Sequence, residues 1–426
     1  MRQADRQHED DAGGEASGGD EVRMEVKAPC AKYFARPRRV LTNAGELPED
    51  WHVQPLGALM CLLNGRAFSP NEWSDAGAPI IRIQNLNDPN SEFNFFSGVA
   101  DERNLIRSGD LLFAWSGTTG SSFGARIWTG PTGVLNQHIF KVLPDPEKLS
   151  PAYAYRLLLK AQHAIERQAH GFKASFVHVK KSDLITVDAG FPPTLYEQDQ
   201  ISGALTDADA LIDSLEQLLT KKRQIKQGAM QELLTGKRRL PGFSGEWRSS
   251  PLGDLAKIKT GSMNNQDKVV DGAYPFFVRS QTVEQIDTFT HDCEAILIPG
   301  EGGIGSIFHY VNGRFALHQR VYGITDFSAE VLGRFLFFYV RVFFGAHAMQ
   351  NSVKATVDSL RLPTFLDFEV RVPPTMDEQA AIVDALSDLE DEAEALESRL
   401  TKARALKQAM AQALLTGRIR LVEPAA

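Results

Sequence analysis

A long internal repeat is the feature that most constrains how this chain can fold. The segment from Leu219 to Leu240 matches the segment from Leu400 to Leu421, with corresponding residues 181 positions apart. The Pro-Pro-x-x-x-Glu-Gln motif that starts at Pro192 recurs at Pro373 with the same offset. Upstream the offset rises to 196 and the sequence diverges. The repeat therefore predicts two copies of a unit in which a variable globular part is followed by a constant helical part.

The matched positions outline the two copies. Trp51 with Pro55-Leu56-Gly57 corresponds to Trp247 with Pro251-Leu252-Gly253, and Gln137 corresponds to Gln319. We expect a disordered tail over 1–45, for which Gly, Ser, Asp and Glu offer little to bury. The remaining expected parts are a first globular domain over 46–193, a helix over 194–240, a second globular domain over 243–374 and a second helix over 375–421.

Composition narrows the class of protein. A chain of 426 residues predicts two to four domains. The three cysteines, Cys30, Cys61 and Cys293, have no metal-ligand spacing, which favours a reducing compartment and hence the cytoplasm. We find no signal peptide and no apolar run long enough to span a bilayer, so no membrane role is expected. A net charge of -8 argues mildly against nucleic acid, although local charge matters more than the average.

Each globular part reads as α+β. Short apolar runs broken by Gly, Asn and Pro predict strands over 78–83, 109–115 and 134–142 and a helix over 152–168. The second part repeats this order, with strands over 274–279, 295–298 and 314–324 and a helix over 329–344. We therefore expect a mostly irregular sheet with one covering helix in each part.

The helical parts carry the clearest periodicity. Apolar residues alternate steps of three and four, which is typical of a coiled-coil seam. The seam positions are Ile201, Leu205, Ala208, Ile212, Leu215 and Leu219 in the first helix, and Ile382, Leu386, Leu389, Ala393, Leu396 and Leu400 in the second. One such stripe would pack on its own domain, but two matched stripes favour packing on each other.

Charge predicts the direction of that packing. Both helices are acidic early and basic late, as with Asp209 and Lys226 in the first and Glu390 and Lys407 in the second. Antiparallel packing sets each acidic half against a basic half, and many weak pairs together select the orientation. We predict an antiparallel coiled coil of two helices, each on the order of 60 Å long. It would separate two globular domains related by a pseudo-twofold axis.

The repeated motifs, taken together and in the order in which they occur, resemble those of the specificity subunit of type I restriction-modification systems. The resemblance covers about 46–423, and rests on Leu47-Pro48-Glu49-Asp50-Trp51, on its internal copy at Phe243 to Trp247, on the two Glu-Gln helix starts and on the two Leu-Leu-Thr-Gly endings. It implies that each globular part is a target recognition domain for one half of a split, asymmetric DNA site. It also implies that the helices dock two methylation subunits, that restriction and translocation subunits join the complex, and that the chain itself is not an enzyme.

The sequence contains no motif typical of a catalytic or cofactor-binding site, in keeping with a subunit that is not an enzyme. There is no Gly-x4-Gly-Lys-Ser/Thr loop, so we expect no catalytic residue, metal or cofactor here, with S-adenosylmethionine, ATP and Mg²⁺ on the partner subunits. Residues 300–305 match G-x-G-x-x-G, but a strand is expected to follow, so a tight turn is favoured over a nucleotide site. A fused methyltransferase or nuclease and a coiled-coil scaffold without DNA specificity remain as alternatives.

The residues expected to contact DNA are polar or aromatic and stand in loops beside the predicted strands. Arg reads guanine, whereas Asn and Gln read adenine in the major groove. The candidates are Arg82, Gln84, Asn85, Trp115, Ser116 and Lys173 in the first domain, and Arg279, Ser280, Gln281, Asn351, Ser352 and Lys354 in the second. Lys173 and Lys354 occupy matched positions, which suits a contact with the phosphate backbone.

Overall fold

The chain was analysed as a computed structural model, which describes residues 38–88, 91–171, 176–350 and 359–423. These residues form two compact units. One contains the described residues up to Leu205 together with those from Met410 onward, and the other spans Thr206–Ala409. Each unit thus combines one globular domain with parts of both long helices.

The first unit opens with a hairpin. Strands β1 (Arg39–Thr42) and β2 (Gly45–Pro48) pair with each other, and the Arg39 side chain donates to the carbonyl of Thr416 at 3.1 Å. The expected disordered tail over 1–45 is therefore too long, because a hairpin begins at Arg39. The hairpin could not be predicted from the sequence, because its strands have only four residues each and lack the alternation of apolar and polar residues that is typical of a strand.

Two four-stranded sheets build the first globular domain. Their orders are β10-β8-β12-β4 and β6-β5-β11-β7. The strands are β4 (Met60–Asn64), β5 (Ala78–Ile81), β6 (Asn94–Phe96), β7 (Leu105–Ile106), β8 (Leu111–Ala114), β10 (Gly124–Ile127), β11 (Gly133–Leu135) and β12 (Ile139–Pro144). Two small pairs complete it: β9 (Ser116–Thr118) with β13 (Phe176–His178), and β3 (His52–Pro55) with β14 (Asp188–Phe191).

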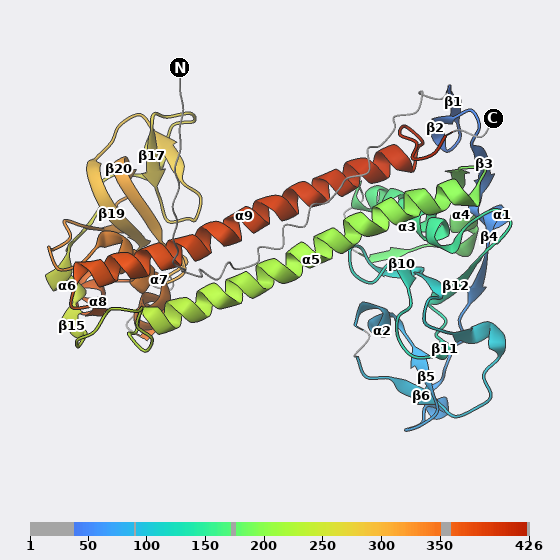
Figure 1. Cartoon of the computed structure of the whole chain (residues 1–426), viewed down its shortest axis with the longest axis horizontal. Helices are drawn as coiled ribbons and strands as arrows, with labels where there is room; N and C mark the ends of the chain where they lie inside the picture. The colour runs from blue at the N-terminus through green and yellow to red at the C-terminus, as the bar shows by residue number, and fades with distance from the viewer. Residues whose placement is uncertain (1–37, 89–90, 172–175, 351–358, 424–426) are drawn as a thin grey trace, which may run out of the picture. The chain divides into compact units, whose positions relative to one another are not determined.

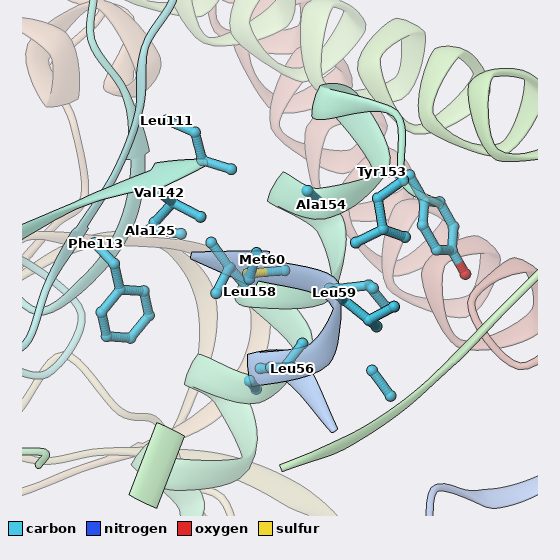
Figure 2. Packing of buried hydrophobic residues seen from close by; sticks show 14 of the residues in the cluster. Leu56, Leu59, Met60, Leu111, Phe113, Ala125, Val142, Tyr153, Ala154 and Leu158 are labelled. Carbon is cyan, nitrogen blue, oxygen red and sulfur yellow. The ribbon is translucent and has the colours of Figure 1, made fainter. Parts of the chain in front are cut away.

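The short helix α2 (Ile83–Asn87) packs on a separate cluster that contains Ile81 and Leu135. Helix α3 (Pro151–Gly171) covers the first of these sheets, accompanied by the short helices α1 (Leu56–Leu59) and α4 (Lys181–Ile185). Figure 2 shows the core between them, where Leu59 and Met60 lie close to Leu158 of α3. The same cluster includes Ile201 and Leu205. Removal of this apolar surface from water is what orders a domain with so many short strands.

A single six-stranded sheet builds the second globular domain, in the order β16-β21-β19-β20-β17-β18. Its strands are β16 (Lys257–Thr260), β17 (Tyr274–Phe277), β18 (Glu284–Ile286), β19 (His291–Pro299), β20 (His309–Leu317) and β21 (Val321–Thr325). Around it lie β15 (Arg248–Pro251) paired with β22 (Glu369–Val372), α6 (Leu252–Leu255), α7 (Gly333–Gln350) and α8 (Leu362–Leu366). Helix α7 packs on β19 through an aromatic face that buries Phe335, Phe338 and Phe344.

A long helix of 39 residues follows each globular domain. These helices are α5 (Leu195–Leu233) and α9 (Met376–Leu414), the two long helices of Figure 1. Three residues after each helix end stands a glycine with positive φ, Gly236 (+67°) and Gly417 (+62°), which lets the chain turn away from the helix in a left-handed conformation. A Cβ at Gly417 would collide with Pro48, and one at Gly236 would press on Trp247.

The middle parts of α5 and α9 pack on each other inside the second unit. Leu215 and Leu219 form a buried cluster with Ala393, Leu396 and Leu400. The predicted seam is thus confirmed in its middle, with Ile212 partly buried beside it. At its ends the seam merges with the domain cores. Ile201 and Leu205 share a cluster with first-domain residues and with Leu414 of α9, and Ile382 and Leu386 share one with second-domain residues and with Met230 and Leu233 of α5. Ala208 and Leu389 are only partly buried.

Ion pairs fix the helix direction. From Asp209 to Lys226 along α5, the paired residue on α9 moves back from Lys407 to Glu390, so the helices are antiparallel, as predicted. The pairs are Asp209–Lys407, Glu216–Arg404 (2.6 Å), Lys222–Glu392 (2.6 Å), Arg223–Glu397 and Lys226–Glu390 (2.7 Å). Four of these five form two sets related by the 181-residue offset, so the duplication is visible contact by contact.

The repeated Glu-Gln motif docks each domain on the start of a helix. Gln198 and Gln379 are fully buried, and their Oε1 atoms accept hydrogen bonds from the backbone N–H of Ser150 (2.9 Å) and Leu332 (2.8 Å). The α+β class, the duplicated domains and the antiparallel helix pair are therefore confirmed. In the described parts of the chain, no helix is long and apolar enough to cross a membrane.

Candidate nucleic-acid interface

In the first domain, backbone hydrogen bonds tie together four chain segments at the ends of strands from both four-stranded sheets. Asn136 N–H donates to the carbonyl of Ile81 at 3.0 Å, and Trp115 N–H donates to that of His138 at 3.3 Å. Val179 N–H donates to the carbonyl of Trp115 at 2.9 Å. The end of β5, the segment after β8, the turn between β11 and β12 and the segment after β13 therefore meet at one place.

The second domain repeats this arrangement with different residues. His318 N–H donates to the carbonyl of Phe277 at 3.1 Å, Gly300 N–H to that of Arg320 at 2.9 Å, and Leu360 N–H to that of Gly300 at 2.8 Å. The match makes Gly300 the counterpart of Trp115 and Arg320 the counterpart of His138. We call these two places the first and second recognition edges.

A tight turn presents a glutamine at each edge. The N–H of Ile139 donates to the carbonyl of Asn136 at 3.2 Å, and that of Val321 donates to His318 at 2.9 Å. Each turn exposes the glutamine that follows its first residue, Gln137 or Gln319. The sequence had predicted single strands through both turns, which was wrong. The apolar residues on either side of each turn belong to two different strands.

Aromatic rings dominate the first recognition edge. The Trp115 ring lies 5.2 Å from His138 and 4.8 Å from His178, and its Nε1–H donates to the carbonyl of Gln137 at 3.1 Å. Trp115 is partly exposed and His178 is exposed. A held aromatic ring of this kind can stack on a base or a sugar.

The other predicted residues of the first domain differ in access. Gln84 is exposed, and the guanidinium of Arg82 lies over the Trp73 ring at 5.6 Å. Asn85 is fully buried: its Oδ1 accepts from the Arg82 N–H at 3.1 Å and its Nδ2 donates to the carbonyl of Ser91 at 3.3 Å. Ser116 is 8% exposed inside β9. Asn85 and Ser116 therefore support the edge and do not reach its surface.

Charged side chains dominate the second recognition edge. Arg279 and Arg320 both contact Glu301, Nη1 of Arg279 lying 3.2 Å from Oε2 and Nη1 of Arg320 lying 3.1 Å from Oε1. Beside them the exposed Gln319 donates through Nε2 to Asn264 Oδ1 at 2.7 Å.

Two further predicted residues follow Arg279 in the chain. Gln281 is exposed, whereas the Ser280 hydroxyl donates to the carbonyl of Thr282 at 2.8 Å and so shapes the loop. Among the predicted contacts of this domain that the structure describes, Arg279 and Gln281 are therefore the two exposed ones.

Two exposed arginines lie near His318 at this edge. Burial lowers the pKa of His318, and the guanidinium groups of Arg279 and Arg320 lower it further, against the smaller opposing effects of Glu301 and Asp267. A positive field close to exposed donors is what a polyanion such as DNA requires, even in a chain of net negative charge.

Four predicted DNA contacts lie outside the described residues: Lys173, Asn351, Ser352 and Lys354. The described residues that flank them lie at the recognition edges. His178 pairs with Ser116, and Ser359 forms a bridge with Glu301.

Residue-by-residue reasoning missed Gln137, Gln319, Glu301 and Arg320. The match between the two glutamines was the available signal, since it persists where the surrounding loops diverge. Nothing local marked Glu301, which sits in the glycine-rich loop that was expected to be only a tight turn.

Among the described residues, no group of three or more His, Cys, Asp or Glu side chains could hold a metal ion. Cys61 and Cys293 are free thiols. The arrangement at the two edges is suited to binding, with donors, acceptors and rings displayed on a fixed backbone.

Comparison with known proteins agrees with this architecture. The type I restriction modification DNA specificity domain matches the chain twice, over residues 48–227 and 244–403. The specificity subunit of the EcoDI type I restriction enzyme of Escherichia coli is 30% identical over 171 residues, which is 40% of this chain and 37% of that relative. The MjaVIII specificity subunit of Methanocaldococcus jannaschii is 21% identical over 412 residues, covering 88% of this chain and 94% of that relative.

Solved structures share the fold. The S subunit of a type I restriction-modification system from M. genitalium aligns with a TM-score of 0.58 at 15% identity, covering 85% of this chain and 96% of that one. A chain from a study of type I R-M complex assembly and conformational transition aligns with a TM-score of 0.51 at 18% identity, covering 87% and 99%. With two matches that together span most of its length, the chain belongs to the type I restriction modification DNA specificity family.

Proposed function

We propose that this chain is the DNA-reading subunit of a type I restriction-modification complex, in which each recognition edge reads one half of a bipartite, asymmetric DNA site. The observation that carries the proposal is the pair of recognition edges. One backbone frame is built twice, and it displays Trp115 and His138 at one edge but Glu301 and Arg320 at the other. A repeated frame with different side chains suits the reading of two different half-sites.

The subunit itself performs no chemistry in this proposal. Adenine methylation with S-adenosylmethionine and cleavage driven by ATP and Mg²⁺ belong to two methylation subunits and to restriction and translocation subunits. The complex works on double-stranded DNA in the cytoplasm. The proposed base contacts here are Arg82, Gln84 and Trp115 at the first edge and Arg279 and Gln281 at the second, together with Gln137, Gln319 and Arg320. Lys173, Asn351, Ser352 and Lys354 remain proposed contacts from the sequence.

Helix α5 offers a surface for a methylation subunit. Leu211, Leu218 and Ile225 repeat every seven residues outside the seam and are 52%, 41% and 45% exposed. Apolar side chains in such a stripe are typical of helix docking. Leu218→Asp should weaken copurification with the methylation subunit, whereas the same change at the exposed Gln217 should not.

The experiment that tests the proposal is a methylome. The chain is expressed with its cognate methylation subunit in a host that lacks adenine methylation, and modified adenines are mapped by long-read sequencing. We expect a split motif of two short half-sites about one helical turn apart. A contiguous motif would show that the two edges do not read separate halves. A stable complex without any modification would favour a scaffold.

A further inference from the structure

Glu301 lies between two arginines that come from different parts of the second domain. Arg279 follows β17, Arg320 lies in the turn before β21, and Glu301 follows β19. The two carboxylate oxygens are divided between the two guanidinium groups, Oε2 to Arg279 at 3.2 Å and Oε1 to Arg320 at 3.1 Å.

Exposure shows which groups stay available to a ligand. The side chains of Arg279 and Arg320 are 50% and 59% exposed, whereas that of Glu301 is only 22% exposed. Each guanidinium has five N–H donors in a planar fork, and each meets Glu301 through Nη1. The carboxylate thus holds one nitrogen of each fork, while about half of each arginine side chain stays exposed.

Backbone equivalence shows that this arrangement is specific to the second edge. Because Gly300 corresponds to Trp115 and Arg320 to His138, Glu301 corresponds to Ser116, which is buried in β9. Since Phe277 corresponds to Ile81, Arg279 corresponds to Ile83, and the first domain holds Ile83, Ser116 and His138 where the second holds Arg279, Glu301 and Arg320. The two domains share the backbone arrangement, but only the second carries the charged group of Arg279, Glu301 and Arg320.

We infer that Arg279 and Arg320 read guanine in the half-site of the second domain, with Glu301 as the positioning residue. This inference rests on the proposed function and deepens it. A bidentate contact to O6 and N7 of guanine is the commonest specific use of arginine in the major groove. A phosphate is the less suitable ligand, because the Glu301 carboxylate would repel it at short range, whereas the guanine edge offers neutral acceptors.

Three variants test the inference in the complete complex, with modified adenines mapped genome-wide. Arg279→Gln and Arg320→Gln should each relax one guanine position of one half-site, reducing discrimination there by about 5- to 150-fold, the range for one bidentate pair. The other half-site should be unchanged. Arg248→Gln is the matched control, since Arg248 is a half-exposed arginine of the same domain that pairs with Glu330 away from the edge.

Glu301→Gln separates positioning from mere structural support. It should relax the same guanine positions, and it should also raise affinity for unrelated DNA and steepen the dependence of that affinity on salt, because a carboxylate that repels phosphate is gone. Glu301→Asp keeps the charge and should restore most of the discrimination. A loss of folding would instead lower all binding without a steeper salt dependence.

The outcomes keep the two levels of the proposal apart. If the unchanged chain yields no bipartite motif, the proposed function fails. If it yields such a motif but neither half contains guanine, or if the two arginine variants lower modification uniformly without relaxing any position, the guanine inference alone is overturned. Relaxation in both half-sites by one variant would also overturn it.

Discussion

Removal of the Arg420 side chain should loosen the first unit where the chain's first and last described segments meet. Its Nη1 lies 3.0 Å from both carboxylate oxygens of Asp50, and its Nη2 donates to Glu197 Oε2 at 2.6 Å. The side chains of Arg420 and Glu197 are each only 2% exposed. One guanidinium therefore connects the end of the chain after α9, the start of α5 and the segment after β2.

The size of the effect follows from burial. Truncation of one partner of a buried ion pair leaves the other charge uncompensated, at a cost of about 3–5 kcal/mol. Burial already raises the pKa of Glu197 against the opposing effect of Arg420. Loss of Arg420 should therefore raise that pKa further and let Glu197 take up a proton. We expect Arg420→Ala to lower the free energy of unfolding by an amount in this range at neutral pH, and by less at low pH, where Glu197 is protonated.

The duplication supplies an internal comparison. Arg239 pairs with Glu378 as Arg420 pairs with Glu197, but its side chain is 23% exposed. It also donates to the carbonyl oxygens of Gly245 (2.7 Å) and Ser244 (3.0 Å). Because the Glu378 side chain is itself only 1% exposed, its charge would also be left without a partner, so Arg239→Ala should cost about 3–5 kcal/mol as well.

Hydrogen–deuterium exchange measures the loss locally. Arg420→Ala should speed exchange in 39–60, at the start of α5 and at the end of α9, while Arg239→Ala should act at the start of α9 and near Trp247. Arg418→Ala is the control, since Arg418 is exposed two residues away. Equal exchange in the Arg420 and Arg418 variants would refute the reasoning, because a buried guanidinium would then stabilise no more than an exposed one.

Two further predictions concern the helix pair. Leu215→Asp combined with Leu396→Asp places carboxylates where the leucines are 6% and 7% exposed. Truncation of a buried leucine lowers the free energy of unfolding by about 2–5 kcal/mol, and each of these changes should lower it by at least as much. Copurification should show loss of partner assembly while circular dichroism shows folded domains; intact assembly would disprove the coiled-coil contact. Burial opposes ionisation of Glu390, but Lys226 and Arg341 outweigh it and lower its pKa. Its stabilisation is therefore present above the unfolded value of 4.5 and lost as pH falls through the folded pKa, and Glu390→Gln should flatten acid unfolding below about pH 4.5.

The architecture could be predicted because it rests on periodic and repeated signals. The seam, the charge order and the glycine caps such as Gly236 each have a local physical cause that a sequence displays directly. The extent of the domain cores along the seam could not be predicted, since a buried Ile201 looks the same in sequence whether it faces another helix, a domain core or both. That choice depends on how far the globular domain extends along the helix.

The recognition edges were only partly predictable for a related reason. Gln84 and Asn85 are neighbours with nearly the same chemistry, yet one is exposed and the other is fully buried as a loop support. The difference arises from the short helix α2, which aims them in different directions. Contacts such as that between Glu301 and Arg279 join residues 22 positions apart across separate loops, and no local pattern announces them.

Net charge gave the weakest guide to function, and the structure explains why. Much of the acidity lies on α5 and α9, where Asp209, Glu216, Glu390 and Glu397 are engaged by basic side chains of the partner helix. At the second recognition edge, by contrast, two arginines share one carboxylate, which leaves an excess of positive charge. Because phosphate contacts supply most nonspecific affinity, a chain with this distribution gains selectivity from base edges and little general affinity of its own. Tight binding should therefore require the methylation subunits to supply phosphate contacts, while the choice of sequence stays with the two edges.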